Sequence, residues 1–266
     1  MLFNSHAFIL LFLPVTLGGF WVLKRLGVGV SIVWLSILST LFYVWWNPLY
    51  LPLLLSSIAF NFFMGRLVGK TQSKLLAGLA ISANIGLLLY YKYLHFFTSL
   101  IPSDLGVPVI PELVLPLAIS FFTFTQIGYI VEVLRGKLLG HSFKEYYFFV
   151  AFFPHLIAGP IVQAGVLLPQ LRSGCFKADS RMFAAGLTLF VMGLFKKVLI
   201  ADPIAAYANP IFYAAEAGQA LTIIEAWTGA LAYSLQLYYD FSGYSDMAIG
   251  LGAMFGIRFP MNFNSP

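Results

Sequence analysis

Long apolar stretches of about 16 to 22 residues recur along the chain, separated only by short polar breaks. A helix that crosses the hydrocarbon core of a bilayer needs about 20 mostly apolar residues, so these stretches have the length of membrane helices. Hydrocarbon offers no partners to backbone amides, which favours helices, and the alternating polarity of a membrane β-barrel is missing from this sequence. We predict an all-α, polytopic transmembrane protein with about 7–9 membrane helices. The expected spans are residues 7–23, 30–46, 49–64, 75–91, 113–134, 182–200 and 220–239, with a shorter apolar helix at 244–257.

The composition excludes several other classes of protein. Of the 266 residues, 60% are hydrophobic and 9% are charged, whereas soluble domains contain about 25% charged residues. The 27 Phe, 14 Tyr and 5 Trp residues exclude intrinsic disorder. The 15 Lys and Arg residues lie in ones and twos rather than on a basic face, so we expect no nucleic-acid partner. One cysteine, Cys175, excludes an internal disulfide and a cysteine-based zinc site, and we expect no metal. Without an internal repeat, residues 1–266 form one expected membrane-embedded domain.

Positive charge is distributed unevenly among the predicted loops. Cytoplasmic loops are enriched in Lys and Arg. The breaks after the first, third and fifth spans contain two, three and three basic residues, eight in all, whereas the connections at 47–48 and 95–112 contain none. The N-terminus is therefore predicted to lie outside. The eight residues are Lys24, Arg25, Arg66, Lys70, Lys74, Arg135, Lys137 and Lys144. Lys196 and Lys197 fall late in the 182–200 span, and the sequence leaves their role open.

Residues 146–171 (YYFFVAFFPHLIAGPIVQAGVLLPQL) are apolar enough to span, but Pro154, Gly159 and Pro160 interrupt any helix there. The following loop, residues 172–181, is again basic, so a full crossing would place its charges outside. A segment that enters and returns to the same side removes this conflict. Irregular backbone at membrane depth is tolerated where protein or a watery cavity covers it. We predict a broken, re-entrant segment.

His155 lies inside this segment, and ionisable groups at membrane depth are functional candidates because they are costly. Three interpretations are open: a neutral ring bonded to carbonyls that the prolines free, a group in a substrate path, or a catalytic base. Gln126 in the fifth span has the same structural and substrate-path alternatives. Glu132 is interpreted as pairing with Arg135 at the interface. The histidines at span ends are interpreted as interfacial: His6, His95 and His141.

The densest polar cluster is YYDFSGYSD at residues 238–246. In a structural interpretation, Gly243 permits a sharp break, Ser245 caps the next helix and Asp246 suits the positive end of that helix. In a functional interpretation, the cluster lines a cavity mouth that holds a hydroxylated substrate. For Asp240, which has no cation nearby in sequence, we expect either a tunnel-facing position or a distant Arg or Lys partner. The substrate-path candidates here are Asp240, Ser242, Tyr244 and Asp246.

The run YYDFSGYSDMAIGLGAMFGIRFPMNFNSP resembles the membrane-bound O-acyltransferase family, in particular the integral membrane subunit of bacterial alginate O-acetylation systems. The opening MLFNSHAFILLFLPV, the central FFPHLIAGPIVQ and the stretch GLFKKVLIAD are similar to the same subfamily. The proposed catalytic His of that family lies in a Trp-His-Gly type motif further along the chain, and no Trp-His pair occurs here. The resemblance therefore implies a chain that is incomplete at its C-terminus, and no catalytic residue is assigned.

What the resemblance implies is acyl transfer in the bacterial inner (cytoplasmic) membrane. An acyl thioester such as acetyl-CoA would be the donor substrate on the cytoplasmic side, with no bound cofactor. A family His would remove the proton of a hydroxyl acceptor inside a tunnel, whose walls we expect at 146–171 and 238–246. The implied partners are the lipid bilayer, a periplasmic acetyltransferase and an exopolysaccharide acceptor.

Two other classes of function stay open from the residues alone. A transporter or channel would use a discontinuous helix with a polar group at membrane depth, but inverted repeats would require a second interrupted segment, which the sequence lacks. A non-catalytic scaffold or remnant is the other class, because the Trp-His pair is missing. We expect the 266-residue chain to be inactive by itself.

Overall fold

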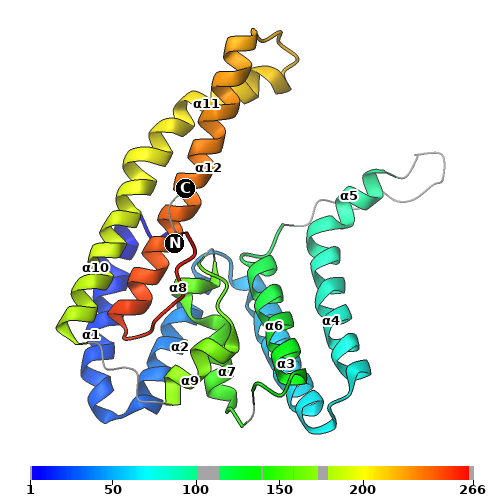
Figure 1. Cartoon of the computed structure of the whole chain (residues 1–266), viewed down its shortest axis with the longest axis vertical. Helices are drawn as coiled ribbons and strands as arrows, with labels where there is room; N and C mark the ends of the chain where they lie inside the picture. The colour runs from blue at the N-terminus through cyan, green and yellow to red at the C-terminus, as the bar shows by residue number, and fades with distance from the viewer. Residues whose placement is uncertain (1, 101–113, 139, 158, 173–178, 264–266) are drawn as a thin grey trace. The chain divides into compact units, whose positions relative to one another are not determined.

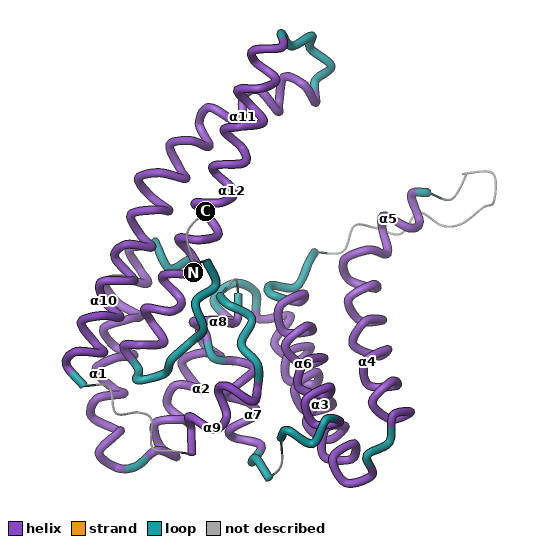
Figure 2. The backbone as a smooth tube through the Cα atoms, in the orientation of Figure 1, coloured by secondary structure: helices purple, strands orange, loops and turns teal. Residues whose placement is uncertain are grey.

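The computed structural model describes residues 2–100, 114–138, 140–157, 159–172 and 179–263. Within these ranges helices dominate and no residue lies in a β-strand (Figure 2). The predicted all-α, polytopic membrane fold is confirmed. Four helical stretches are long and apolar enough to cross a membrane: Phe8–Leu26, Pro48–Thr71, Lys74–Ser99 and Ser180–Glu216. Two shorter helices are also apolar: Val28–Val44 and Ile119–Leu134.

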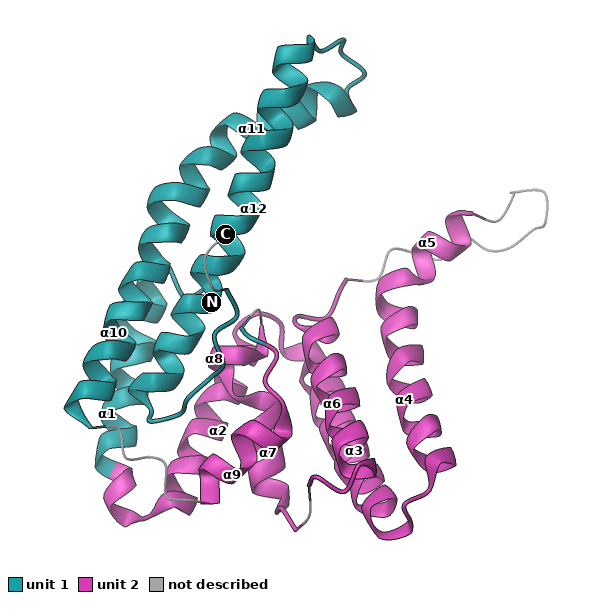
Figure 3. Ribbon diagram, viewed as in Figure 1, with its two compact units in different colours: residues 1–22, 158–160, 175–266 teal, residues 23–157, 161–174 magenta. Residues whose placement is uncertain are grey.

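The chain forms two compact units (Figure 3). Unit 1 contains residues 1–22, 158–160 and 175–266, and unit 2 contains residues 23–157 and 161–174. The assignment of residues 1–266 to a single domain stays a prediction.

Unit 2 is a bundle of helices whose starts follow from local capping. Ser73 accepts a hydrogen bond from the Leu76 amide and begins α4, and a reciprocal capping box between Ser142 and Glu145 begins α7. The elements are η2 Lys24–Leu26, α2 Val28–Val44, η3 Pro48–Tyr50, α3 Leu51–Thr71, α4 Lys74–Leu88, η4 Leu89–Tyr93, α5 Leu94–Ser99, α6 Ile119–Leu134, α7 Phe143–Ala151, α8 Phe153–Leu156 and α9 Ala164–Arg172.

The predicted interruption within 146–171 is confirmed. Helix α7 ends where Phe152 adopts an extended ψ of 112°, the short α8 follows, and α9 begins only at Ala164. The Phe153 amide donates to Ser39 Oγ of α2 at 3.0 Å, so a neighbouring side chain satisfies backbone at the break. Glu132 accepts a hydrogen bond from the Gly165 amide at 2.8 Å, and no ion pair joins it to Arg135 within the described ranges, so the expected pairing is wrong. The re-entrant path itself stays a prediction.

Unit 1 is built around a long helical hairpin (Figure 1). Its first arm is one continuous helix of 37 residues, Ser180–Glu216, and its second arm, α12, has 32 residues. Asp179 caps the first arm, and a capping box between Thr222 and Glu225 begins the second. The elements of unit 1 are η1 Phe8–Phe12, α1 Leu13–Leu23 up to residue 22, α10 Ser180–Phe195, the π-helical η6 Lys196–Ala201, α11 Asp202–Glu216 and α12 Ile223–Met254.

Glycines bring the two arms of the hairpin into close contact. A Cβ added at Gly243 would lie 2.8 Å from the Gly193 carbonyl oxygen, and one at Gly186 would lie 2.6 Å from the Gly250 carbonyl oxygen. On each arm the two glycines are seven residues apart, which is about two helical turns and keeps them on one face. Small residues let the backbones of membrane helices approach in this way.

Two expectations about this unit are wrong. Gly243 does not break the chain, because α12 runs without interruption from Ile223 to Met254 and packs that glycine against α10. The region 201–219, which the predicted spans 182–200 and 220–239 leave between them as a connection, is largely the helix α11. Its Pro203 lies inside the continuous helix Ser180–Glu216, directly after the π-helical turn η6.

Candidate functional site

The six candidate residues divide between the two units. Asp240, Ser242, Tyr244 and Asp246 all lie on α12 of unit 1, whereas Gln126 on α6 and His155 on α8 belong to unit 2.

An ion-pair network joins the arms of the hairpin beside the glycines. Lys196 Nζ lies 2.7 Å from Asp246 Oδ2, and Lys197 Nζ lies 2.7 Å from Asp240 Oδ1 and 2.8 Å from Asp202 Oδ1. Both lysines come from the π-helical turn η6, a local geometry often found at functional sites. The network gives the two lysines, whose role the sequence left open, three carboxylate partners.

The two predicted carboxylates behave differently from one another. Asp240 was expected either to face a tunnel or to pair with a distant Arg or Lys. It pairs with Lys197, and its side chain remains 44% exposed. Asp246 was expected to stabilise a helix N-terminus, but it lies inside α12 with a side chain only 9% exposed and pairs with Lys196. Ser245 likewise lies inside the helix rather than at its cap. The close approach at Gly243 keeps the helix continuous and thereby removes the expected terminus.

Three hydroxyl groups next to these carboxylates are buried and have no hydrogen-bond partner among the described residues: those of Ser242, Tyr244 and Ser245. Ser242 and Ser245 are three positions apart on α12, so they share a face of the helix. The Tyr244 ring stacks on Phe3 with centroids 4.6 Å apart. Buried polar atoms normally have partners, so each of these hydroxyls lacks an expected hydrogen bond.

Gln126 lies at the centre of a buried amide cluster in unit 2. Ser57 Oγ donates to Gln126 Oε1 at 2.8 Å, and the Asn61 amide group donates to the same oxygen. Asn61 and Asn84 exchange two hydrogen bonds of 3.1 Å and 2.7 Å, which links α3, α4 and α6. Gln126 Nε2 is buried without a partner among the described residues. The geometry favours the structural interpretation of Gln126, because its oxygen joins α6 to α3 and Asn61 extends the same cluster to α4.

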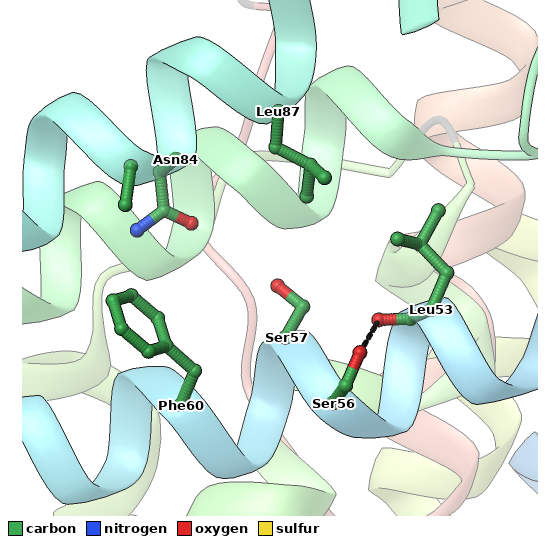
Figure 4. Close-up of a pocket in the computed structure, with 7 residues that line it drawn as sticks. Leu53, Ser56, Ser57, Phe60, Asn84 and Leu87 are labelled. Atoms are coloured by element: carbon green, nitrogen blue, oxygen red, sulfur yellow. Dashed lines mark hydrogen bonds between the residues drawn. The ribbon is translucent and has the colours of Figure 1, made fainter. Parts of the chain in front are cut away.

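A small pocket of about 240 Å³ opens between α3 and α4 beside this cluster (Figure 4). Ser57 and Asn84 point toward the gap between the two helices, whereas Ser56 donates to the Leu53 carbonyl of its own helix at 3.0 Å. Most of the wall is apolar. The lining residues are Leu53, Ser56, Ser57, Phe60, Ala83, Asn84 and Leu87.

His155 is buried among aromatic rings. Its side chain is 3% exposed, and its ring centroid lies 6.3 Å from that of Phe149 and 6.2 Å from that of Phe152. No described contact joins this ring to Gln126. Its surroundings resemble a packed core, although a place in the substrate path stays a proposal.

His141 is the residue that sequence reasoning missed. It was interpreted as interfacial, yet it is 7% exposed and its Nε2 lies 2.7 Å from the Tyr129 hydroxyl. Burial lowers the pKa of His141, as does the nearby Arg172 guanidinium, while Glu145 opposes them. The signal in the sequence is the Ser142–Glu145 capping box, which fixes a helix start next to this histidine.

Residues 134–266, half of the chain, match the model of the membrane-bound O-acyltransferase (MBOAT) family. The chain belongs to the MBOAT family. The family inferred from the 238–266 run is thereby confirmed, and the comparisons do not favour the transporter interpretation.

Several relatives of this MBOAT chain align with its full length, and others align with part of it. The peptidoglycan O-acetyltransferase of Helicobacter pylori is 39% identical over 302 residues, covering 100% of this chain and 56% of the relative. The probable alginate O-acetylase AlgI of Pseudomonas aeruginosa is 41% identical over 277 residues, covering 100% of this chain and 52% of the relative. A teichoic acid D-alanyltransferase of Streptococcus thermophilus is 28% identical over 182 residues, covering 65% of this chain and 44% of the relative. The chain spans about half the length of the first two relatives.

Proposed function

We propose that this chain is part of a membrane-bound O-acetyltransferase that modifies an exopolysaccharide of the alginate type. One observation carries the proposal: the whole chain aligns at 39% and 41% identity with two relatives whose names specify O-acetylation. Their acceptors differ, peptidoglycan in one and alginate in the other, so the shared substrate class is a glycan hydroxyl.

The proposed reaction moves an acetyl group from a thioester donor, acetyl-CoA or a related acyl thioester, to a hydroxyl oxygen. The hydroxyl oxygen attacks the thioester carbonyl, the C–S bond breaks, and the hydroxyl proton passes through a base to the leaving thiolate. A His near neutrality is matched to this role, and the family motif that supplies it is not in this chain. Exclusion of water by the membrane protein limits hydrolysis of the thioester.

Within the proposal, this chain supplies walls of the substrate path. The buried, unpartnered hydroxyls of Ser242 and Tyr244 support this, because each can donate to a carbonyl oxygen. Asp240 supports it as the half-exposed carboxylate that Lys197 holds in place. His155, Gln126 and Asp246 remain weaker candidates, since each has a packing or pairing role of its own.

We place the protein in the bacterial inner membrane with its N-terminus outside. The eight-to-none distribution of basic residues over the predicted loops supports this orientation. The donor then enters from the cytoplasmic side, and the proposed partners, a periplasmic acetyltransferase and the exopolysaccharide, lie on the other side.

Deletion of the gene and complementation with the complete reading frame test the function. Acetyl esters released by mild alkali are measured separately on secreted polysaccharide and on purified peptidoglycan. Loss and recovery of esters on the secreted polysaccharide are expected. A change in ester content confined to peptidoglycan would show that peptidoglycan is the acceptor and would refute the exopolysaccharide assignment. Unchanged esters on both glycans would refute the O-acetyltransferase assignment.

A further inference from the structure

A second pocket in unit 2 lies at the ends of α3 and α6. Its volume is about 290 Å³. A water molecule occupies about 30 Å³ in the liquid, so this pocket can hold a polyatomic group. The lining residues are Gly65, Arg66, Gly69, Lys70, Val133, Leu138, Gly140 and His141.

The pocket contains positive charge that the described residues do not neutralise. Neither Arg66 nor Lys70 forms an ion pair within the described ranges, and the Arg66 guanidinium lies 5.3 Å from the centre of the Phe62 ring. The nearby Glu145 is already engaged, because Arg172 and the Ser142 amide both bond to its carboxylate. A bound anion would provide the missing countercharge.

A buried polar group in the pocket wall also has an unused hydrogen-bonding atom. His141 Nδ1 is buried and has no hydrogen-bond partner among the described residues, while Nε2 contacts Tyr129. The Gly140 backbone beside it has a positive φ of 70° and is held by a 2.7 Å hydrogen bond from Arg172 to its carbonyl. Arg172 thereby holds the Gly140 backbone in place, and its positive charge is paired with Glu145.

The pocket lies beside the turn between two helices that are long and apolar enough to cross a membrane. Helix α3 ends at Thr71 and α4 begins at Lys74, so the chain turns back directly beside the pocket. A turn between two membrane helices marks the interface, where phospholipid phosphates lie. Basic pockets between membrane helices at this level suit anionic headgroups.

We propose that the Arg66–Lys70–His141 pocket binds the phosphate of an anionic phospholipid headgroup. Arg66 and Lys70 supply the positive charge, and the imidazole of His141 supplies a hydrogen bond. A soluble phosphate compound shares this chemistry, and the experiment separates the two sources. The site is independent of acyl transfer.

Native mass spectrometry of the complete protein in detergent tests this site, with phosphatidylglycerol, phosphatidylcholine or inorganic phosphate as the added probe. The test variant is Arg66→Gln with Lys70→Gln. The matched control is Lys74→Gln with Lys137→Gln, which removes the same charge from exposed residues outside the pocket. Each basic residue near an anionic surface strengthens binding by about fivefold, so the test variant should bind phosphatidylglycerol roughly 25-fold more weakly.

The expected result is retention of phosphatidylglycerol by the wild type and the control, with little retention of phosphatidylcholine. Equal losses in the test and control variants would show a general charge effect and overturn the site. Displacement of the lipid by millimolar inorganic phosphate would show that a soluble phosphate compound, and not a phospholipid, is the ligand of the pocket. A thermal melting curve of each variant verifies that folding is retained.

Discussion

Lys196 and Lys197 are neighbours in sequence but hold different parts of the hairpin together. Lys196 contacts the nearly buried Asp246 of α12. Lys197 bridges Asp202 of its own arm and Asp240 of α12, which is more exposed than Asp246. Charges that leave water need partners, because an unpaired ion at membrane depth is costly. This difference in exposure is the reason why we propose a structural role for Asp246 and a place in the substrate path for Asp240.

Asp240→Asn in the complete protein should strongly reduce acetylation while its amount in the membrane stays near normal. The carboxylate is half-exposed, so its loss removes a proposed wall of the substrate path at little cost in stability. Asp202→Asn is the matched control, because it removes the other partner of Lys197 from outside the 238–246 cluster. Ester content per protein is the measurement, and equal activity in the two variants would contradict a role beyond ion pairing.

Asp246→Asn should instead lower the stability of the folded protein. It leaves the Lys196 charge without its partner, and breaking a buried pair costs up to about 3 kcal/mol. Replacement of both partners, Lys196→Met with Asp246→Leu, should recover most of that loss, since apolar residues can replace such a pair. Thermal unfolding in detergent measures all three variants, and an unchanged melting temperature for Asp246→Asn would show that the pair contributes nothing.

At the scale of the elements, hydropathy predicts the membrane helices well but not where they end. The helices near 30–46 and 75–91 appear close to their predicted places, as Val28–Val44 and Lys74–Leu88. The continuity of α12 could not be predicted from the sequence. A glycine such as Gly243 is compatible both with a helix break and with a close helix contact, and only the position of Gly193 on the other arm decides between them. The ion pairs depend on the same unknown, since Lys196 and Asp246 are 50 residues apart.

Gly193→Ala should destabilise the hairpin. An added Cβ at this position would collide with the backbone of α12 around Gly243 and Met247, and overpacking of this kind costs about 1–3 kcal/mol. Gly18→Ala on α1 is the matched control, because no atom lies within 4 Å of its added Cβ, and it should be neutral or slightly stabilising. Melting temperatures compare the two, and equal shifts would show that the close approach is unimportant.

At the scale of the whole molecule, the basic segments at 65–74, 135–145 and 172–181 should all face the cytoplasm. In a Cys175→Ser background, single cysteines at positions 70, 137 and 177 should resist a membrane-impermeant thiol reagent in intact cells, whereas one at position 47 should react. Position 177 lies outside the described residues. Labelling of position 177 from the periplasm would refute the re-entrant path of 146–171, and protection at position 47 would reverse the orientation.

The pairing of the hairpin also constrains how the protein is made. The first arm, Ser180–Glu216, emerges from the ribosome with two lysines near its middle, before any of α12 exists. Each lysine near the centre of a lone helix disfavours insertion by about 2.5–3.5 kcal/mol. Lys197 has Asp202 of its own arm as a partner, but Lys196 has none until Asp246 is synthesised. We therefore expect the first arm to enter lipid together with α12 rather than alone.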